Sequence, residues 1–311
     1  MAMMLDFEKP VAALDTEIAA LSAKGNAPTA LRRAETRREK LLSEIYGGLS
    51  AWQKTQVARH PDRPRFLRIA DELFTDFTPL AGDRSYGEDP AIIGGPARLG
   101  GRPVMLIGHE KGGTTEERVQ RNFGMAKPEG YRKAARLMEL AGRLRLPIVT
   151  LVDTPGAFPG IDAEERGQAE AIARSTAACL DAPVPMVAVI IGEGGSGGAV
   201  ALAAANRVLM LEHAVYAVIT PEGCASILWR DAAKAADAAA AMRITAADLR
   251  ALAVVDEVIP EPVGGAHRAP HTAIAAIGAA IGAALASLDG AAGAELKAMR
   301  RQRFLAFAQA Q

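Results

Sequence analysis

The stretch PVPMVAVIIGEGGSGGAVALAAANRVLMLE, residues 183–212, decides the fold. Its pattern predicts a buried strand at 186–191, a turn with five glycines between Gly192 and Gly198, a helix to about Asn206, and a second strand at 208–211. Glycines between a strand and a helix leave backbone N–H groups uncovered at a helix N-terminus. Such groups bind anions or stabilise an oxyanion, so this turn is the first candidate for a functional site.

The same order of strand, turn and helix occurs on both sides of this stretch. A strand at 147–152 precedes a turn at 153–160 and a helix at 164–180, and a strand at 215–219 leads into Pro221-Glu222-Gly223. Apolar runs at 91–99 and 103–108, separated by Gly100-Gly101-Arg102, predict a hairpin. Repeated units of this kind predict an α/β protein.

Both ends of the chain have helical patterns. Apolar residues at helical spacing predict two antiparallel helices at 7–24 and 29–46, and the uncharged stretch 272–288 has one apolar helical face. The latter is too short and too weakly apolar for a membrane span. We expect an N-terminal helical appendage (1–75), a core domain (76–265) and a C-terminal helical region (266–311).

Composition excludes several functional classes. The 36 Lys and Arg residues balance the 36 Asp and Glu residues, so net charge favours neither nucleic acid nor an anionic membrane as a partner. The two cysteines, Cys179 and Cys224, form no CxxC pair, and we expect no disulfide framework and no metal site. The opening MAMMLDFEKP lacks the basic and apolar segments of a signal peptide, which predicts a cytoplasmic location.

The glycines fit two short motifs of known chemistry. Gly192, Gly194 and Gly197 match the GxGxxG pattern of dinucleotide-binding folds, with Glu212 at the distance of a ribose ligand. Gly194, Ser196 and Gly198 match the GxSxG pattern of a nucleophile elbow. The triad would then be completed downstream, by Asp256 with His267 or His271.

A third interpretation needs no ionisable side chain. Backbone N–H groups from the glycine turn and from the turn at 153–160 stabilise a carbonyl oxygen that gains negative charge during reaction. This arrangement suits chemistry on thioesters or on ureido carbonyls, where an enolate or a ureido anion must be held. It would also explain why the chain has no convincing catalytic side chain.

Long ordered motifs resemble one family. They are GHEKGGTTEERVQRNFGMAKPEGYRKAARLMELA (108–141), DTPGAFPGIDAEERGQAEAIAR (153–174), VIIGEGGSGGAVALAAANRVLML (189–211), YAVITPEGCASILWRD (216–231) and IPEPVGGAHRAP (259–270). Together they look like the carboxyltransferase alpha subunit of bacterial acetyl-CoA carboxylase. The resemblance begins at LDFEKP (5–10) and covers essentially the whole chain.

The resemblance implies a crotonase-like (ClpP/crotonase) fold, a superhelix of repeated β-β-α units. It implies transfer of a carboxyl group from carboxybiotin, held by the biotin carboxyl carrier protein, to acetyl-CoA to give malonyl-CoA for fatty acid synthesis. The implied partners are a zinc-ribbon-containing beta subunit in an α2β2 assembly, the carrier protein and biotin carboxylase. This chain has neither a Met-Lys-Met biotinylation motif nor four cysteines for a zinc ribbon, which fits that division of roles.

The resemblance also implies roles for particular residues. Gly194, Gly195, Gly197 and Gly198 are expected to form the backbone oxyanion hole for carboxybiotin. The residues expected to form the neighbouring wall or to meet substrate groups are Asp153, Thr154, Pro155, Gly156, Phe158, Gly160, Glu165, Arg166, Lys111 and Lys127.

Two positions depart from the family pattern, and one basic segment has two possible functions. Gly113 stands where a basic residue is expected, and Asp162 stands where a glycine is expected, so the biotin entrance departs from the family pattern. The basic run Arg32, Arg33, Arg37 and Arg38 is typical of a solvated helix face. RNA or partner binding through this run is the alternative.

Overall fold

The computed structural model describes residues 3–25 and 27–307 and contains one mixed sheet. Its strands are β1 (Phe74–Thr75), β2 (Ile92–Leu99), β3 (Arg102–His109), β4 (Ile148–Thr154), β5 (Met186–Gly195), β6 (Arg207–Leu211), β7 (Val215–Ala217) and β8 (Glu257–Ile259). Their order is β1-β2-β3-β4-β5-β6-β8, and β7 pairs with the end of β5. The first three strands pair antiparallel and the others are parallel, so the loops that follow β3, β4 and β5 meet at one end of the sheet.

The predicted glycine turn is wrong in its first half, because β5 continues through Gly195. Residues Glu193–Gly195 pair with Val215–Ala217 of β7, and Gly194 also pairs with Thr154 of β4. A glycine-rich run can stay extended when strands on both sides supply hydrogen-bond partners. Here the missing side chains let neighbouring backbones approach closely.

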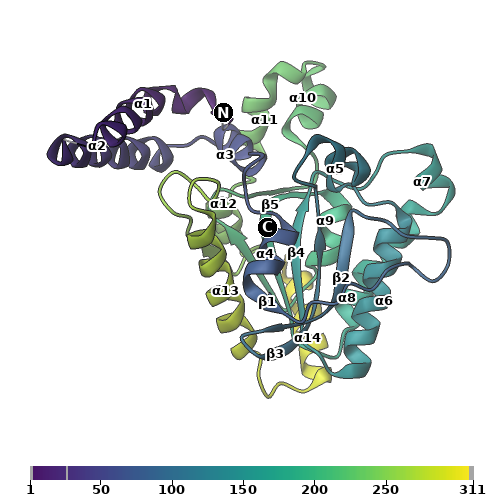
Figure 1. The fold of residues 1–311 in the computed structure, drawn as a ribbon. Helices are drawn as coiled ribbons and strands as arrows, with labels where there is room; N and C mark the ends of the chain where they lie inside the picture. The colour runs from purple at the N-terminus through teal and green to yellow at the C-terminus, as the bar shows by residue number, and fades with distance from the viewer. Residues whose placement is uncertain (1–2, 26, 308–311) are drawn as a thin grey trace.

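Helices cover both faces of the sheet (Figure 1). The helices are α1 (Lys9–Lys24), α2 (Pro28–Gly47), α3 (Ala51–Ala58), α4 (Phe66–Leu73), α5 (Thr115–Gln120), α6 (Pro128–Leu144), α7 (Ile161–Glu165), α8 (Gln168–Asp181), α9 (Ser196–Ala203), α10 (Pro221–Trp229), α11 (Ala235–Ala241), α12 (Ala246–Ala251), α13 (Pro270–Ala286) and α14 (Gly293–Ala306). Helices α6, α8 and α9 pack on one face, and α4 and α13 pack on the other. The described helices include none long and apolar enough to cross a membrane.

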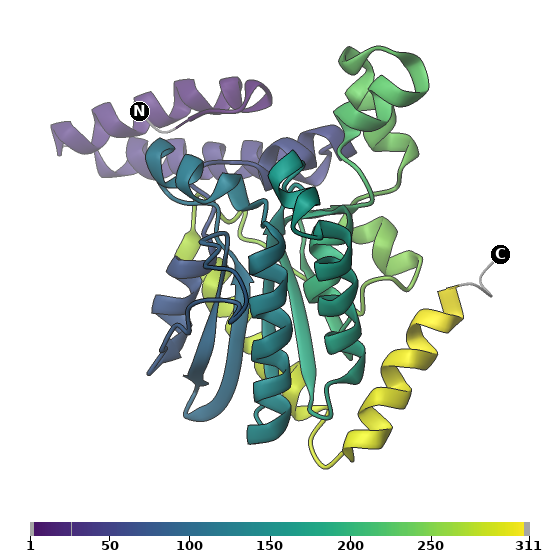
Figure 2. The ribbon, with the colours of Figure 1, turned by 90° about the vertical axis from the view of Figure 1, so that its right-hand side faces the viewer.

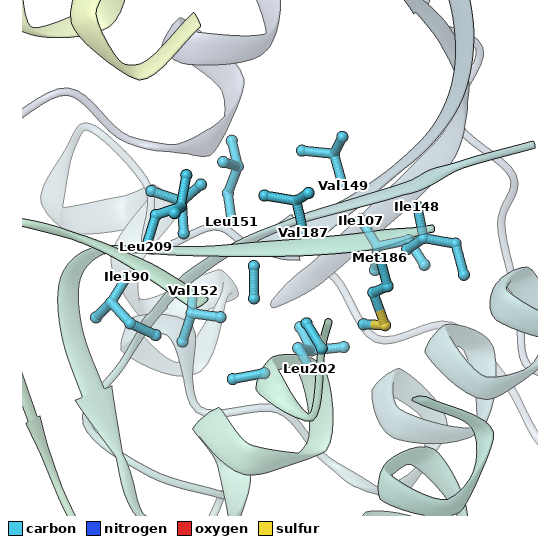
Figure 3. Packing of buried hydrophobic residues seen from close by; sticks show 14 of the residues in the cluster. Ile107, Ile148, Val149, Leu151, Val152, Met186, Val187, Ile190, Leu202 and Leu209 are labelled. Atoms are coloured by element: carbon cyan, nitrogen blue, oxygen red, sulfur yellow. The ribbon is translucent and has the colours of Figure 1, made fainter. Parts of the chain in front are cut away.

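The core lies between these helices and the parallel strands. Ile148, Val149, Leu151 and Val152 of β4 are fully buried, and residues from the neighbouring strands and from α9 pack around them (Figure 3). Every residue of β4 and β5 is buried, which is the pattern of central parallel strands covered on both faces. The α/β prediction is therefore confirmed.

One predicted helix is two helices in the structure. The stretch expected as a single helix at 164–180 forms α7 and α8, and Gly167 between them has a φ of 81°. That left-handed conformation interrupts the helical hydrogen bonding and suits glycine. The short helix α7 consequently leans out over the end of the sheet that carries the loops (Figure 1).

The N-terminal hairpin projects from the rest of the chain (Figure 1). Helices α1 and α2 pack against each other around a small cluster that contains Leu5, Val11 and Leu42. By contrast, α4 and β1 pack with the sheet, since Phe66 and Phe74 belong to the main core. The division of the chain at residues 75 and 265 stays a prediction.

The basic run on α2 is in part paired within this hairpin. Arg37 contacts Glu17 of α1 at 2.5 Å, and Arg38 contacts Asp15 at 3.5 Å. These contacts across the hairpin are what a solvated helix face makes. Nothing in the geometry favours the RNA-binding alternative.

Candidate active site

Two turns from neighbouring strands touch at the loop-bearing end of the sheet. A Cβ atom added to Gly195 would lie 2.1 Å from the carbonyl oxygen of Pro155, and one added to Gly198 would lie 2.9 Å from the carbonyl carbon of Gly156. The turn after β4 is held internally by Thr154, whose Oγ1 donates to the Gly156 carbonyl at 2.7 Å and accepts from the Gly156 N–H at 3.1 Å. Contact of this closeness requires glycine.

Helix α9 begins at this contact with an open N-terminus. Gly195 is its N-cap residue, and no described side chain caps its first turn. The first N–H groups of a helix have no partner within the helix, so those of Gly197 and Gly198 need an acceptor from outside it. Together with the positive end of the helix dipole they favour negative charge at this point.

An apolar cavity of about 680 Å³ opens at this N-terminus. Ser196 and Gly197 form its polar end, and Val200, Tyr216 and Val218 lie along its wall. The size is in the usual range for a small-molecule site. Burial raises the pKa of Tyr216 to about 12, so its phenol is neutral at physiological pH.

Charged side chains form a buried network behind the glycines. The ammonium of Lys111 lies 2.7 Å from Asp153 and 2.9 Å from Glu193, and Glu193 in turn accepts from Arg59 at 2.6 Å. Arg59 also contacts Glu222 at the start of α10, at 2.5 Å. This chain of charges connects β4 and β5 to helices α3 and α10.

The network keeps its members charged. Burial opposes the charge on Lys111, but the carboxylates of Asp153 and Glu193 outweigh it and raise the pKa of the lysine. Burial likewise opposes the charge on Glu193, yet Lys111 and Arg59 lower its pKa. Lys111 is therefore held as a structural cation beside the glycine segment rather than extended toward solvent.

The outer wall of the site consists of the turn at 153–160 and the start of α7. The ammonium of Lys127 lies 4.8 Å from the ring centroid of Phe158 and 3.0 Å from Asp162. Arg166 contacts Glu129 at 2.6 Å, and Gly160 is the N-cap residue of α7. Asp162, a departure from the family pattern, thus provides a partner for Lys127.

The expected site residues therefore divide into three groups. Gly194, Gly195, Gly197, Gly198, Asp153, Thr154, Pro155 and Gly156 lie together at the junction of β4, β5 and α9. Phe158, Gly160, Arg166 and Lys127 form the outer wall, and Lys111 lies in the buried network. Glu165 is exposed at the end of α7 and has no ion pair with another described residue.

The structure does not assemble the dinucleotide site. Gly192 and Gly194 lie within β5, and a Cβ atom at Gly192 would be 2.5 Å from the Asp153 carboxylate. Glu212 accepts a hydrogen bond from the Glu261 N–H rather than facing the glycines. The GxGxxG match is accidental, because the motif needs a turn where this chain has a strand.

The proposed catalytic triad is not assembled either. Asp256 precedes β8, at the end of the sheet opposite Ser196, and its carboxylate accepts from Arg303 at 2.5 Å. The ring of His267 stacks on His60 at 4.0 Å, and His271 contacts Glu72 at 2.8 Å. Ser196 does have the positive φ of 55° that a nucleophile elbow shows, but it lacks a base and an acid.

Ser196→Ala is therefore expected to change the transfer rate by less than about threefold, since its hydroxyl performs no nucleophilic step. The measurement is the steady-state rate of the assembled enzyme, with labelling of the native chain by a fluorophosphonate probe as a second readout. We expect no labelling. A large loss of rate together with labelling at Ser196 would restore the hydrolase interpretation.

The sequence did not identify Arg59, Glu193 and Glu222 as members of the site. Arg59 is more than a hundred residues away in the chain from both Glu193 and Glu222. Only the fold brings them together. One signal was present: Glu193 is a charged residue inside an otherwise apolar and glycine-rich strand. A charge at such a position needs a buried partner.

Comparison with known proteins points to one family. A family model described as acetyl co-enzyme A carboxylase carboxyltransferase-like matches residues 4–308. An acetyl-coenzyme A carboxylase carboxyl transferase subunit alpha from Sphingopyxis alaskensis is 62% identical and covers 100% of both chains. The protein of the same name from Agrobacterium fabrum is 58% identical and covers 97% of both chains.

Solved structures with the same fold are more distant in sequence. Transcarboxylase 12S has a TM-score of 0.60 at 20% identity, over 76% of this chain and 44% of that one. A Pseudomonas malonate decarboxylase hetero-tetramer in complex with coenzyme A has a TM-score of 0.56 at 19% identity, over 72% of this chain and 93% of that one. These likenesses confirm the crotonase-like fold.

Proposed function

Because the chain belongs to the family of acetyl-CoA carboxylase carboxyltransferase alpha subunits, we propose that the junction of β4, β5 and α9 is its half of the active site. The reaction is transfer of a carboxyl group from carboxybiotin to acetyl-CoA, which gives malonyl-CoA. The observation that carries the proposal is the open N-terminus of α9, which faces an apolar cavity.

The main task of this chain is to stabilise negative charge. When carboxybiotin is bound, it supplies the carboxyl group, and its ureido oxygen gains charge as that group leaves. The N–H groups of Gly197 and Gly198 would donate to this oxygen, and each such donor contributes about 3 kcal/mol in comparable sites. Because these donors are fixed by the contact with Pro155 and Gly156, they need no rearrangement during reaction.

The apolar cavity matches the apolar part of biotin, just as the glycine N–H groups match its ureido oxygen. The sulfur-containing ring and the aliphatic chain of biotin are apolar, and so are Val200, Val218 and Ile244 along the cavity wall. Binding there would place the polar end of the ring system at Ser196 and Gly197 and would keep water away from the leaving carboxyl group.

The partners follow from the same assignment. We propose that the acetyl-CoA half of the site lies on a beta subunit in an α2β2 assembly, with biotin delivered by the carrier protein after carboxylation by biotin carboxylase. The subunit designation of the relatives supports an assembly of several chains, as do the hetero-oligomeric structures of similar fold.

Reconstitution tests this function. The purified chain, the beta subunit and the carboxylated carrier protein are mixed with acetyl-CoA, and malonyl-CoA is measured. We expect product only when all components are present. Product from this chain without the beta subunit, or no product from the complete mixture, would contradict the proposal.

An exposed apolar group on α10 supports the proposal of an interface with a beta subunit. Ile227, Leu228 and Trp229 are 72%, 64% and 40% exposed, and Figure 2 shows α10 standing clear of the sheet near the carboxyl ends of the strands. Val218, which is 81% exposed, lies at the edge of the cavity below it. Exposed apolar residues grouped beside a site are typical of a protein interface.

Ile227→Asp is expected to weaken the association with the beta subunit by about tenfold or more, because a buried unpaired charge costs more than 1.4 kcal/mol. Sedimentation velocity with the purified beta subunit measures this loss. The control is Leu144→Asp, which introduces the same charge at an exposed position at the far end of α6 and should leave association unchanged. Equal affinity of the two variants would place the interface elsewhere.

A further inference from the structure

A second cavity, of about 350 Å³, lies on the outer side of the loop that carries Lys111. Arg65 and Arg68, beside the start of α4, line it on one side, and Arg121 after α5 lines it on another. The backbone at Gly112 and Gly113 closes it. This cavity is separate from the apolar one at α9, with which it shares no lining residue.

Two of the arginines that line this cavity, Arg65 and Arg121, have no acidic partner among the described residues, and neither has Arg118, which lies close to Arg65. Among residues 3–25 and 27–307, no carboxylate lies within 4.0 Å of Arg65, Arg118 or Arg121, although 17 arginine–carboxylate pairs occur elsewhere in these residues. Within the part of the chain that the structure describes, the side chain of Arg65 donates only to the carbonyl of Pro61, at 3.0 Å, and that of Arg121 only to the carbonyl of Pro90, at 2.7 Å. The neighbouring Arg68 differs, since it pairs with Glu72 at 3.0 Å.

Each of the three guanidinium groups also has a nitrogen that is buried without a partner. These atoms are Nη1 of Arg65, Nε of Arg118 and Nε of Arg121. Burial, followed by the nearby charge of Arg118, lowers the pKa of Arg65, although the charges of Asp153, Glu110 and Glu117 oppose this effect, so Arg65 and Arg118 repel each other. Buried donors without partners are rare, and they indicate a missing acceptor.

The carboxylates that line the cavity are already engaged or face solvent. Glu110 accepts from the N–H groups of Leu67 and Gly112, at 2.8 and 2.6 Å, and Glu117 accepts from those of Gly113 and Thr114. Asp62 is exposed. None of them neutralises the three arginines, although they reduce the positive charge of the cavity and therefore the affinity we expect.

We propose that this cavity binds a phosphate or diphosphate group of a small molecule through Arg65 and Arg121, with Arg118, beside Arg65, as a third cation. Guanidinium groups present planar pairs of donors that match the oxygens of a phosphate, and charge-assisted bonds of this kind are strong. A multiply charged anion would satisfy the buried donors and remove the repulsion among the three cations. The inference does not depend on the proposed function of the α9 cavity.

Calorimetric titration of the full-length chain at low ionic strength tests the site, with inorganic pyrophosphate and inorganic phosphate as probes. We expect saturable binding, tighter for pyrophosphate, that weakens as salt is added. Arg65→Gln and Arg118→Gln should each weaken binding by about tenfold, as expected for one lost charge-assisted contact. Arg33→Gln, which removes an exposed arginine of α2, is the matched control and should bind as the native chain does.

Two further measurements test whether a weak-binding variant is folded and which compound supplies the phosphate. Thermal unfolding without anion establishes that a weak-binding variant is folded, and Arg118→Gln removes no hydrogen bond to a described residue, so it should fold normally. Competition by coenzyme A would identify a nucleotide as the source of the phosphate, whereas lack of competition would identify a free phosphate compound. No saturable binding of pyrophosphate up to millimolar concentration, or equal binding by all three variants, would overturn the inference.

Discussion

Gly195→Ala is expected to reduce carboxyl transfer by about 100-fold or more. The added methyl group would lie 2.1 Å from the Pro155 carbonyl oxygen and 2.8 Å from the Gly156 nitrogen, so the two turns must separate. The N–H groups of α9 would then move away from the ureido oxygen, and loss of one such donor costs about 100- to 1,000-fold in rate. The measurement is the turnover number of the reconstituted enzyme at saturating substrates.

A matched glycine separates this effect from a general loss of stability. A Cβ atom at Gly282 of α13 would meet no atom within 4 Å, so Gly282→Ala should leave the rate unchanged. Gly195→Ala should still bind the beta subunit, since overpacking costs only about 1–3 kcal/mol. Full turnover by Gly195→Ala would show that the oxyanion site is not at this junction.

Lys111→Met is expected to destabilise the chain by about 3 kcal/mol, because it leaves two buried carboxylates without their shared cation. Arg59 still pairs with Glu193, but Asp153 has no other basic partner among the described residues. Chemical denaturation measures the change in the free energy of unfolding. We also expect a lower transfer rate, since Asp153 accepts from the Glu193 N–H beside the glycines.

The stability of Lys111→Met should depend on pH differently from that of the native chain. In the native chain Lys111 and Arg59 lower the pKa of Glu193 against the effect of burial, so its contribution to stability is present above the ordinary pKa and is lost as the pH falls. In Lys111→Met, Glu193 keeps only Arg59 as a cation, so burial favours its protonated form more than in the native chain. The difference in stability should therefore shrink as the pH falls toward 4.5, the ordinary pKa of a glutamate.

Lys127→Met is the control for Lys111→Met. Its ion pair with Asp162 is 30% and 46% exposed, and exposed pairs of this kind contribute less than about 1 kcal/mol. A similar loss of stability in the two variants would contradict a special role for the buried network.

Local patterns were sufficient for much of the fold. The hairpin of β2 and β3 follows from apolar runs on either side of Gly100 and Gly101, and the structure has the predicted boundaries to within a residue or two. The pair of N-terminal helices follows from helical spacing and the break at Gly25. In each case neighbouring residues decide the conformation.

Other features depend on contacts between segments that are far apart in the sequence, and local patterns did not predict them. The segment Gly192–Gly195 reads as a turn by composition, and it is a strand because β4 and β7 pair with it from distant parts of the chain. The network of Lys111, Asp153 and Glu193 likewise joins the loop after β3 to strands β4 and β5, which meet only in the folded sheet. The motif resemblance located the glycines, but their contact with Pro155 required the structure.

We propose above all that the N-terminus of α9 holds the ureido oxygen of biotin. The most direct test is a crystal structure of this chain with the beta subunit and free biotin. We predict biotin in the cavity beside Val200 and Tyr216, with its ureido oxygen within hydrogen-bond distance of the N–H groups of Gly197 or Gly198. Biotin bound with this oxygen directed away from α9, or bound outside the cavity, would contradict the account.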